Sequence, residues 1–295
     1  MDLDAFSAPG QWLKGNLHTH SNKSDGEPSP QQIVDIYAET GYDFLAVTDH
    51  NQLTSVEELD HKGLTLIPGS ELNGGRGELG QHYHLVLIGQ REPAPINGDM
   101  PIQEIIDKAL AVGEMCWIAH PSWSSITARD LAPLQGTLGI EVYNTTCHHG
   151  IGRGESAVQW DELLARGQRP LALAVDDAHW HYEDALGGWT MAKVASREPQ
   201  DILAAIRGGL FYATTGPTIE SLTLGGRALS LTCSPAQEVR LINPMPGSGW
   251  TTFRQQRPGP YTQIEWTIPE AWSMVRVEVV DMSGRKAWTN PFYFD

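Results

Sequence analysis

The sequence predicts a parallel α/β barrel followed by a small antiparallel β region. Apolar strand-like runs alternate with helix-length segments over the first two-thirds of the 295 residues, which is typical of a barrel of parallel strands. Polar residues follow most of these runs, and barrels of this kind form their sites at the carboxyl ends of the strands. From about residue 217 the helical period disappears and short alternating segments begin, which favours antiparallel strands.

The helices and strands of the barrel are assigned from periodicity and end signals. Ser29 and Pro30 before an amphipathic stretch, and Gly41 after it, predict a helix over residues 31–41. Similar patterns predict helices over residues 101–112, 157–167 and 200–208. Short apolar runs predict buried strands over residues 44–48, 64–69, 82–88, 116–119, 139–144 and 171–175.

The last quarter of the chain predicts a β-rich appendage. Alternating segments punctuated by Pro and Gly lie at residues 219–224, 228–232, 239–242, 262–268 and 275–280. We therefore predict two domains, a barrel over residues 1–216 and the appendage over residues 217–295. The appendage suits a cap over the site, a dimer contact or a protein-binding surface equally well.

The composition is acidic, with a formal net charge of -16 from 20 Lys+Arg and 36 Asp+Glu. Such a surface repels phosphate backbones, which argues against a long nucleic acid as partner. Bound cations would offset part of the negative charge. The charge does not bear on the oligomeric state, which stays open.

The cysteines and the N-terminus bear on location. Cys116, Cys147 and Cys233 are far apart and form no C-x-x-C pair, so neither a disulfide framework nor a thiolate zinc site is indicated. The N-terminus shows no basic region followed by an apolar run. No stretch approaches the roughly 20 apolar residues of a membrane helix. These features predict a protein of the reducing cytoplasm with no membrane partner.

Imidazole and carboxylate groups gather at the ends of the predicted strands. His18 and His20 are two residues apart on a strand end and therefore point to the same side. Asp25 follows in a polar loop. The other donors of this kind are His50, Glu71, His82 or His84, His120, Asp177 and His179. Any single one would suit a core histidine or a capping carboxylate, but the set predicts a metal site.

The donor types and their number indicate which metals the site would hold. Imidazole plus carboxylate suits zinc, manganese or iron better than magnesium or calcium. Nine donors, with one of His82 and His84 counted, exceed the needs of one or two metals once water takes a position. They could serve three metals if one carboxylate bridges.

These motifs resemble the PHP (polymerase and histidinol phosphatase) superfamily of metal-dependent phosphoesterases. The resemblance spans about residues 12–216. The matching pieces, in order, are Leu17-His18-Thr19-His20-Ser21 with Ser24-Asp25-Gly26, Thr48-Asp49-His50-Asn51, Gly69-Ser70-Glu71, Ala119-His120-Pro121 and Asp177-Ala178-His179. The tail, Ala287-Trp288-Thr289-Asn290-Pro291, is similar to a PHP subgroup that includes ester and carbamate hydrolases.

The resemblance implies a distorted (β/α)7 barrel with a trinuclear metal site, and we expect two or three divalent metal ions (Zn, Mn or Fe) as cofactors. It assigns His18, His20, Glu71 and Asp177 to the first metal. Asp25, His50 and His179 would hold the second metal. Glu71 would bridge to a third, completed by His84 and His120. His84 resembles the polymerase-type members and His82 the ester-hydrolase subgroup, so both stay open as the ligand, with His84 favoured.

Residues around the ligands receive roles from their position next to the ligand segments. Asp49 is expected to orient a ligating imidazole, and Asp176 either does the same or caps the chain. Lys23, Arg153 and His149 are cationic candidates for binding substrate phosphate, because they lie in loops next to ligand segments. Asn144 follows a strand end and is a further candidate for lining the pocket.

The predicted function is the hydrolysis of a small phosphate mono- or diester. Close divalent metals acidify a bridging water, and the resulting hydroxide would attack phosphorus without a side-chain nucleophile. Glu71, Asp177 and His179 would be the catalytic residues. The tail motif supports carbamate or carboxylic ester hydrolysis on the same metals as an alternative. A non-catalytic metal-binding PHP module is the second alternative, and the complete ligand set argues against it.

Overall fold

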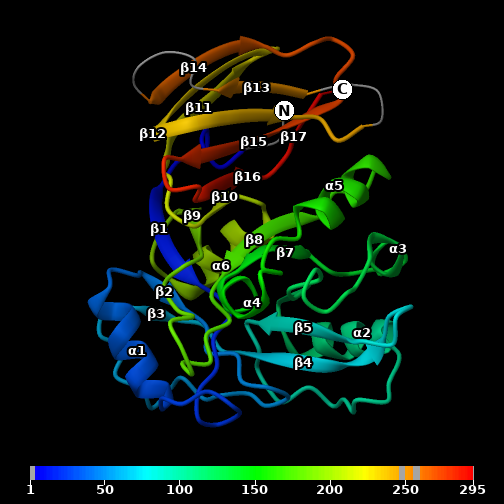
Figure 1. The fold of residues 1–295 in the computed structure, drawn as a ribbon. Helices are drawn as coiled ribbons and strands as arrows, with labels where there is room; N and C mark the ends of the chain where they lie inside the picture. The colour runs from blue at the N-terminus through cyan, green and yellow to red at the C-terminus, as the bar shows by residue number, and fades with distance from the viewer. Residues whose placement is uncertain (1–3, 246–249, 255–259, 295) are drawn as a thin grey trace.

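The computed structural model of the chain describes residues 4–245, 250–254 and 260–294 (Figure 1). The strands of this part form a 12-stranded sheet and a 5-stranded sheet. The larger sheet has the order β11 (Ile219–Gly225), β12 (Ala228–Ile242), β15 (Met274–Asp281), β16 (Lys286–Thr289), β10 (Phe211–Thr214), β9 (Trp189–Val194), β1 (Gln11–Asn16), β2 (Phe44–Leu45) and β3 (Thr65–Leu66). Strands β13 (Trp250–Arg254) and β14 (Tyr261–Thr267) pair with β12, and β17 (Phe292–Tyr293) pairs with β15.

The smaller sheet carries the middle of the chain. Its order is β4 (Gly69–Arg76), β5 (His82–Ile88), β6 (Met115–Ile118), β7 (Gly139–Asn144) and β8 (Leu171–Val175). The described helices are α1 (Pro30–Glu39), α2 (Ile102–Val112), α3 (Ala128–Leu131), α4 (Thr145–Ile151), α5 (Ala157–Ala165) and α6 (Pro199–Arg207). The fold is therefore mixed α/β, as predicted. None of these helices is both long and apolar enough to cross a membrane.

The two sheets approach one another at the ends of their strands. Isolated bridges join Thr19 to Ala178 and His50 to Glu71. The amide of His20 donates to the carbonyl of Ala178 at 2.9 Å. Regular pairing in the described residues gives two sheets and no closed barrel, so the predicted (β/α)7 barrel stays a prediction. The bridges nevertheless bring the strand ends that carry the candidate ligands to one place.

Strand β5 corrects the prediction of parallel strands throughout. It runs antiparallel to both β4 and β6, while β6, β7 and β8 are parallel. The turn between β4 and β5 is closed by a hydrogen bond of 2.9 Å from the amide of Gly77 to the carbonyl of Gln81. So short a connection allows only an antiparallel pair, because parallel neighbours need a long crossover. The start of β5 therefore lies beside the carboxyl ends of its neighbours.

The C-terminal strands pair antiparallel, as predicted, and lie at one end of the molecule, with β4, β5 and α1 at the other (Figure 1). They continue the larger sheet, because β16 pairs with β10. One long strand, β12, covers two predicted segments, and its register shifts between Thr232 and Ala236. Pro235 lies within that irregularity, where a missing amide is tolerated. The division at residues 216 and 217 stays a prediction.

Candidate metal centre

The predicted ligands converge from both sheets. His18 and His20 lie just beyond β1, and His50 just beyond β2. Glu71 lies in β4 and His84 in β5, whose antiparallel direction puts its start at the site. His120 follows β6, and Asp177 and His179 follow β8. Within the described residues, three groups of His, Asp and Glu have ligand atoms that all lie within 4.8 Å of one another.

The first group consists of His18, His20, Glu71 and Asp177, all of them buried. Asp177 Oδ1 lies 3.1 Å from Nε2 of His18 and 2.9 Å from Nε2 of His20. Glu71 Oε2 is 3.5 and 3.3 Å from the same two nitrogens. Two imidazoles and two carboxylates therefore face one point. This group is the set that the PHP resemblance assigns to the first metal.

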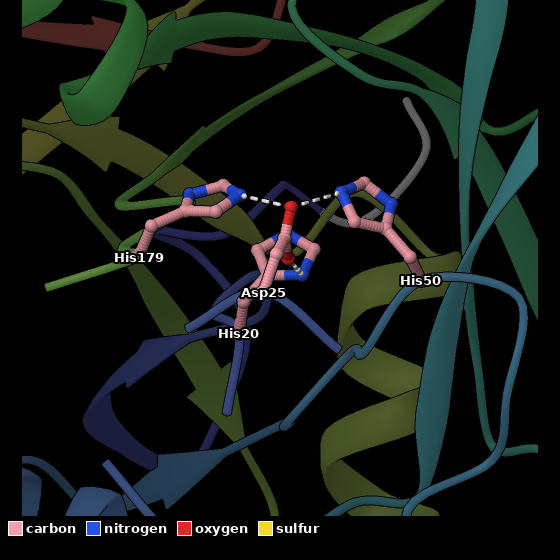
Figure 2. Close-up of side chains that lie close together, drawn as sticks. All are labelled: His20, Asp25, His50 and His179. Carbon is pink, nitrogen blue, oxygen red and sulfur yellow. Dashed lines mark ion pairs between the residues drawn. The ribbon is translucent and has the colours of Figure 1, made fainter. Parts of the chain in front are cut away.

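The second group is His20, Asp25, His50 and His179. Figure 2 shows Asp25 between the two outer imidazoles, with Oδ2 at 3.4 Å from His50 Nε2 and 3.5 Å from His179 Nε2. Nδ1 of His20 lies 3.7 Å from Asp25 Oδ1. The structure thus adds His20 to the three residues expected around a second metal. Asp25 is half exposed, so this side of the centre opens to solvent.

The third group consists of His50, Glu71 and His84. Glu71 Oε1 is 2.8 Å from His84 Nδ1 and 3.2 Å from His120 Nε2. Its other oxygen, Oε2, is 2.8 Å from His50 Nδ1. Glu71 therefore stands between the groups, as a bridging carboxylate would. The structure brings His84 to Glu71, whereas His82 belongs to none of the three groups. Both histidines line an adjoining cavity of about 490 Å³ with Asn73 and Asn97.

The surroundings of Glu71 Oε2 indicate whether these residues suit a cation. Glu71 Oε2 is buried and has no hydrogen-bond partner among the described residues. Imidazole nitrogens of His18, His20 and His50 lie between 2.8 and 3.5 Å from it without hydrogen-bond geometry. A buried, unsatisfied carboxylate oxygen is costly, and a divalent cation held by these nitrogens would satisfy it. The donor set fits zinc, manganese or iron.

The pKa values show how strongly the groups interact in the metal-free state. Burial by itself raises the pKa of Glu71, but His84, His18 and His120 outweigh it and hold that pKa well below its ordinary value. Burial lowers the pKa of His20, whereas the nearby carboxylates of Asp177 and Glu71 raise it to about 9. A proton thus occupies His20 at neutral pH where a cation would otherwise bind.

Glu141 is a residue of the centre that the sequence analysis missed. It is fully buried in β7, and its Oε1 lies 2.7 Å from His18 Nδ1. The same carboxylate accepts from the amide of His120 at 2.9 Å and from Trp117 Nε1 at 3.2 Å. A charged residue inside an otherwise apolar strand was the available signal.

Asn144 is a correction to the predicted pocket lining. Its side chain is fully buried. Nδ2 donates to Glu141 Oε2 at 2.9 Å and to Asp177 Oδ2 at 3.0 Å, and Oδ1 caps α4 by accepting from the amide of Cys147. The amide is therefore committed to positioning two carboxylates and has no surface left for substrate.

Asp49 and Asp176, each of which directly precedes a candidate ligand in the sequence, support loops. Asp49 accepts from the amide of Ser21 at 2.8 Å and from Ser24 Oγ at 2.8 Å. It thus fixes the loop between His20 and Asp25. Ser24 Oγ in turn lies 3.4 Å from His20 Nδ1, so Asp49 reaches a candidate ligand through Ser24, and its expected role in orienting that imidazole stays a prediction. Asp176 accepts from Tyr37 Oη at 2.6 Å and from the amides of Leu186, Gly187 and Gly188. It anchors the loop that follows His179.

A cavity of about 420 Å³ lies over the candidate ligands. Among the described residues, its lining consists of Asp25, His50, Glu71, His84, His120, Trp123, Thr146, Cys147, Gly150, Ile151, Asp177, His179, His181 and Tyr182. No Lys or Arg is in this set. Candidate metal ligands thus form one part of the cavity and largely apolar side chains the remainder.

The three predicted phosphate-binding cations lie outside this lining. Arg153 is exposed, and its guanidinium donates to Ser125 Oγ at 3.1 Å. Lys23 is exposed on the loop before Asp25. His149 Nδ1 lies 2.6 Å from the carbonyl of Glu183 and lines a different cavity. None of the three belongs to the described lining of the cavity over the candidate ligands, so their assignment to substrate phosphate stays a prediction.

Comparisons with known proteins agree with the fold. No family model matches the chain. A phosphoribosyl 1,2-cyclic phosphate 1,2-diphosphodiesterase of Eggerthella lenta is 33% identical over 84 residues, which cover 27% of this chain and 32% of that protein. The match thus spans about a third of that relative's length.

Two solved structures have a similar fold. One, from Bacteroides vulgatus, is described as a two-domain protein containing a predicted PHP-like metal-dependent phosphoesterase. It has a TM-score of 0.53 and 18% identity and covers 100% of this chain and 96% of its own. The other is a putative metal-dependent phosphoesterase from Bifidobacterium adolescentis, with a TM-score of 0.50, 14% identity, and coverage of 68% of this chain and 98% of its own.

Proposed function

We propose that this chain, which shares the fold of PHP-like proteins, is a metal-dependent hydrolase of small phosphate mono- or diesters. The observation that carries the proposal is Glu71, a buried carboxylate with one unsatisfied oxygen, surrounded by imidazoles from both sheets. His18, His20, Glu71 and Asp177 would hold one cation, Asp25, His50 and His179 a second, and Glu71, His84 and His120 a third. Bound divalent cations would supply positive charge for the phosphoryl oxygens and acidify a water molecule.

The chain's own residues would set the geometry of this reaction. Glu141 holds the ring of His18 through Nδ1, so that Nε2 faces Asp177 and His20. Asn144 holds both Glu141 and Asp177. Ser124 Oγ lies 2.9 Å from Nδ1 of His120 and fixes the direction of that ring's Nε2. A site prepared in this way loses little energy to rearrangement when substrate binds.

Net charge limits the size of the substrate. The charge of -16 leaves no long basic track for a nucleic-acid backbone. The clustered cations would instead provide strong, local positive charge for a compact phosphate ester. A small phosphorylated substrate, and no long DNA or RNA, is therefore part of the proposal.

One observation favours a second candidate, the hydrolysis of a carbamate or carboxylic ester. The described cavity lining contains no Lys or Arg, the usual partners of phosphate oxygens. A neutral ester needs no such partner. The same metal ligands would serve either reaction.

The test compares esters that share one leaving group. The full chain, loaded with Mn²⁺ or Zn²⁺, is assayed on p-nitrophenyl phosphate, bis(p-nitrophenyl) phosphate and p-nitrophenyl N-methylcarbamate, with a long oligonucleotide as a fourth substrate. We expect a higher kcat/KM for a phosphate ester, and loss of that activity in Asp177→Asn purified in parallel. Higher kcat/KM for the carbamate would select the second candidate. Stoichiometric metal without turnover of any ester would reject both.

A further inference from the structure

The cavity over the candidate metal ligands contains half of the exposed large hydrophobic side chains of the described residues. Six large hydrophobic residues in the described structure are exposed, and three of them line this one cavity. These are Trp123 at 42%, Ile151 at 61% and Tyr182 at 47% exposure. The other three are Leu79, Val158 and Met282, which are absent from its lining. Scattered exposed apolar residues need no explanation, but a group that lines a cavity indicates a binding surface.

Trp123 is fixed beside the metal ligands. Its ring packs edge-on against His120, with ring centroids 5.0 Å apart, and against His84 at 6.0 Å. The segment that carries it is held by the amide of Ser122, which donates to Ser156 Oγ at 3.1 Å. The amide of Ser124 closes the turn by donating to the carbonyl of His120. The large aromatic ring of Trp123 therefore lies directly beside two candidate ligands, His84 and His120.

Tyr182 and Ile151 line the cavity from other segments. Tyr182 Oη donates to the carbonyl of Thr146 at 3.1 Å, which ties the ring to α4. Ile151 is the last residue of the same helix. The loop that carries Tyr182 is held by Asp184, which accepts from the amides of His179 and Trp180. Contacts within the chain thus hold the Tyr182 ring and the segment that carries Trp123, which lowers the entropic cost of packing a ligand against them.

The charges of the cavity lining limit which ligands the cavity suits. With no Lys or Arg in the described lining, a second phosphate away from the cations would have no partner of opposite charge. Of the imidazoles in that lining, His181 already lies 3.1 Å from Glu27. The cavity therefore suits one phosphoryl group at the ligands and an uncharged group beside it.

We infer that the substrate carries a single phosphoryl group and an uncharged aromatic ring, joined to the ester oxygen directly or through one carbon, which packs against Trp123 and Tyr182. This inference rests on the proposed phosphate-ester hydrolysis. In the reaction, the oxygen of water bonds to phosphorus, the bond from phosphorus to the ester oxygen breaks, and the aryl or arylmethyl alcohol leaves with a proton. The short link follows from the closeness of the Trp123 ring to His120 and His84.

The experiment compares alkyl esters whose leaving alcohols have similar reactivity. Benzyl phosphate, cyclohexylmethyl phosphate and ribose 5-phosphate are hydrolysed by the metal-loaded full chain, and kcat and KM are measured. We expect kcat/KM for benzyl phosphate to be at least tenfold higher than kcat/KM for ribose 5-phosphate. We expect it to be severalfold higher than kcat/KM for cyclohexylmethyl phosphate. A preference for ribose 5-phosphate, or equal values for all three, would overturn the inference while leaving the proposed function intact.

Substitutions of Trp123 test whether its ring causes the expected preference for benzyl phosphate. Trp123→Ala should raise KM for benzyl phosphate about tenfold, as expected for the loss of one stacking contact, and should change KM for ribose 5-phosphate less than twofold. Trp123→Phe should restore most of the loss. Val158→Ala removes an exposed apolar side chain outside the cavity and should change neither value. An equal loss on every substrate in Trp123→Ala would show a structural role and contradict ring recognition.

A binding measurement separates this inference from the proposed function. Benzylphosphonate, which cannot be hydrolysed, is titrated into the metal-loaded chain by calorimetry, with methylphosphonate as the comparison. We expect benzylphosphonate to bind at least tenfold more tightly, and Trp123→Ala to remove that difference. Such binding without turnover of any phosphate ester would reject the proposed function and retain the ring site. Equal affinities for the two phosphonates would reject the ring site.

Discussion

Nδ1 of His18 lies 2.7 Å from Oε1 of Glu141, and both side chains are fully buried. This contact leaves Nε2 of His18 facing Asp177 Oδ1 at 3.1 Å. A ligating imidazole commonly has such a partner on its other nitrogen, which fixes the ring and the position of its proton. Glu141 thus connects the interior of β7 to the candidate metal centre.

The first prediction tests this connection. Glu141→Gln keeps the size of the side chain but removes its charge. Its new NH₂ group would face one of the four groups that now donate hydrogen bonds to Glu141. We expect metal affinity to fall on the order of 10- to 100-fold, measured by competition with a chelator. Glu162→Gln, an exposed position on α5, is the matched control. Equal affinities for both variants would mean that Glu141 does not support the ligands.

The second prediction separates a ligand from a loop support. Asp177→Asn removes a carboxylate that lies within 3.1 Å of both His18 and His20, so activity should fall by orders of magnitude together with metal content. Asp49→Asn weakens the hydrogen bonds that hold Ser21 and Ser24 and should cost on the order of 10- to 100-fold. Metal analysis and kcat/KM are measured on both. Greater metal loss in Asp49→Asn would reverse the two roles.

The third prediction concerns metal removal. Cations that bind only the folded chain stabilise it, by about 4 kcal/mol at a free concentration 1,000-fold above Kd. For a chain of this size, EDTA dialysis should therefore lower Tm by roughly 10 °C, and Mn²⁺ or Zn²⁺ should restore both Tm and activity. Scanning calorimetry measures Tm before and after. Asp177→Asn should show a much smaller response to EDTA. Full turnover in verified metal-free protein would exclude the proposed mechanism.

The fourth prediction is a pH dependence of metal binding. Without a bound cation, burial lowers the pKa of His20, but the nearby carboxylates of Asp177 and Glu71 outweigh it and raise that pKa to about 9. This imidazole is therefore protonated at pH 7, and a binding cation has to displace its proton. Affinity should rise with pH from 7 to about 9 and level off above the raised pKa. Calorimetric titrations in buffers of different ionisation enthalpy measure the protons released. No proton release at pH 7 would contradict the raised pKa.

The fifth prediction addresses the contact between the C-terminal strands and the remainder of the chain. Arg276 in β15 is 2% exposed, and its Nε and Nη2 donate to Asp161 in α5 at 2.7 and 2.6 Å. Asp161→Ala leaves this buried guanidinium without its main partner. The free energy of unfolding should fall by about 2 to 3 kcal/mol, below the full value for a buried pair because Asp161 is partly exposed. Urea unfolding measures the change, and Glu162→Ala on the same helix should have little effect.

The sequence by itself determined the local elements and the ligand types. The predicted helix at residues 31–41 agrees with α1 (Pro30–Glu39), and the predicted strand at residues 171–175 with β8 (Leu171–Val175). Both depend on short-range signals, which are caps, apolar periods and runs. The alternation of side chains also placed His18 and His20 on one side, and their donor atoms do meet.

Only the tertiary structure decided which distant residues share a buried space. The pairing of Ala213 with Trp288 joins the C-terminal strands to the larger sheet, and no local pattern contains that register. The role of Glu141 depends on the contact between β7 and His18, which lies 123 residues before Glu141 in the chain. Likewise, Lys23 and Arg153 lie near ligands in sequence but outside the cavity. Local propensity fixes the direction of a side chain on its own element, whereas its partners depend on how the elements pack.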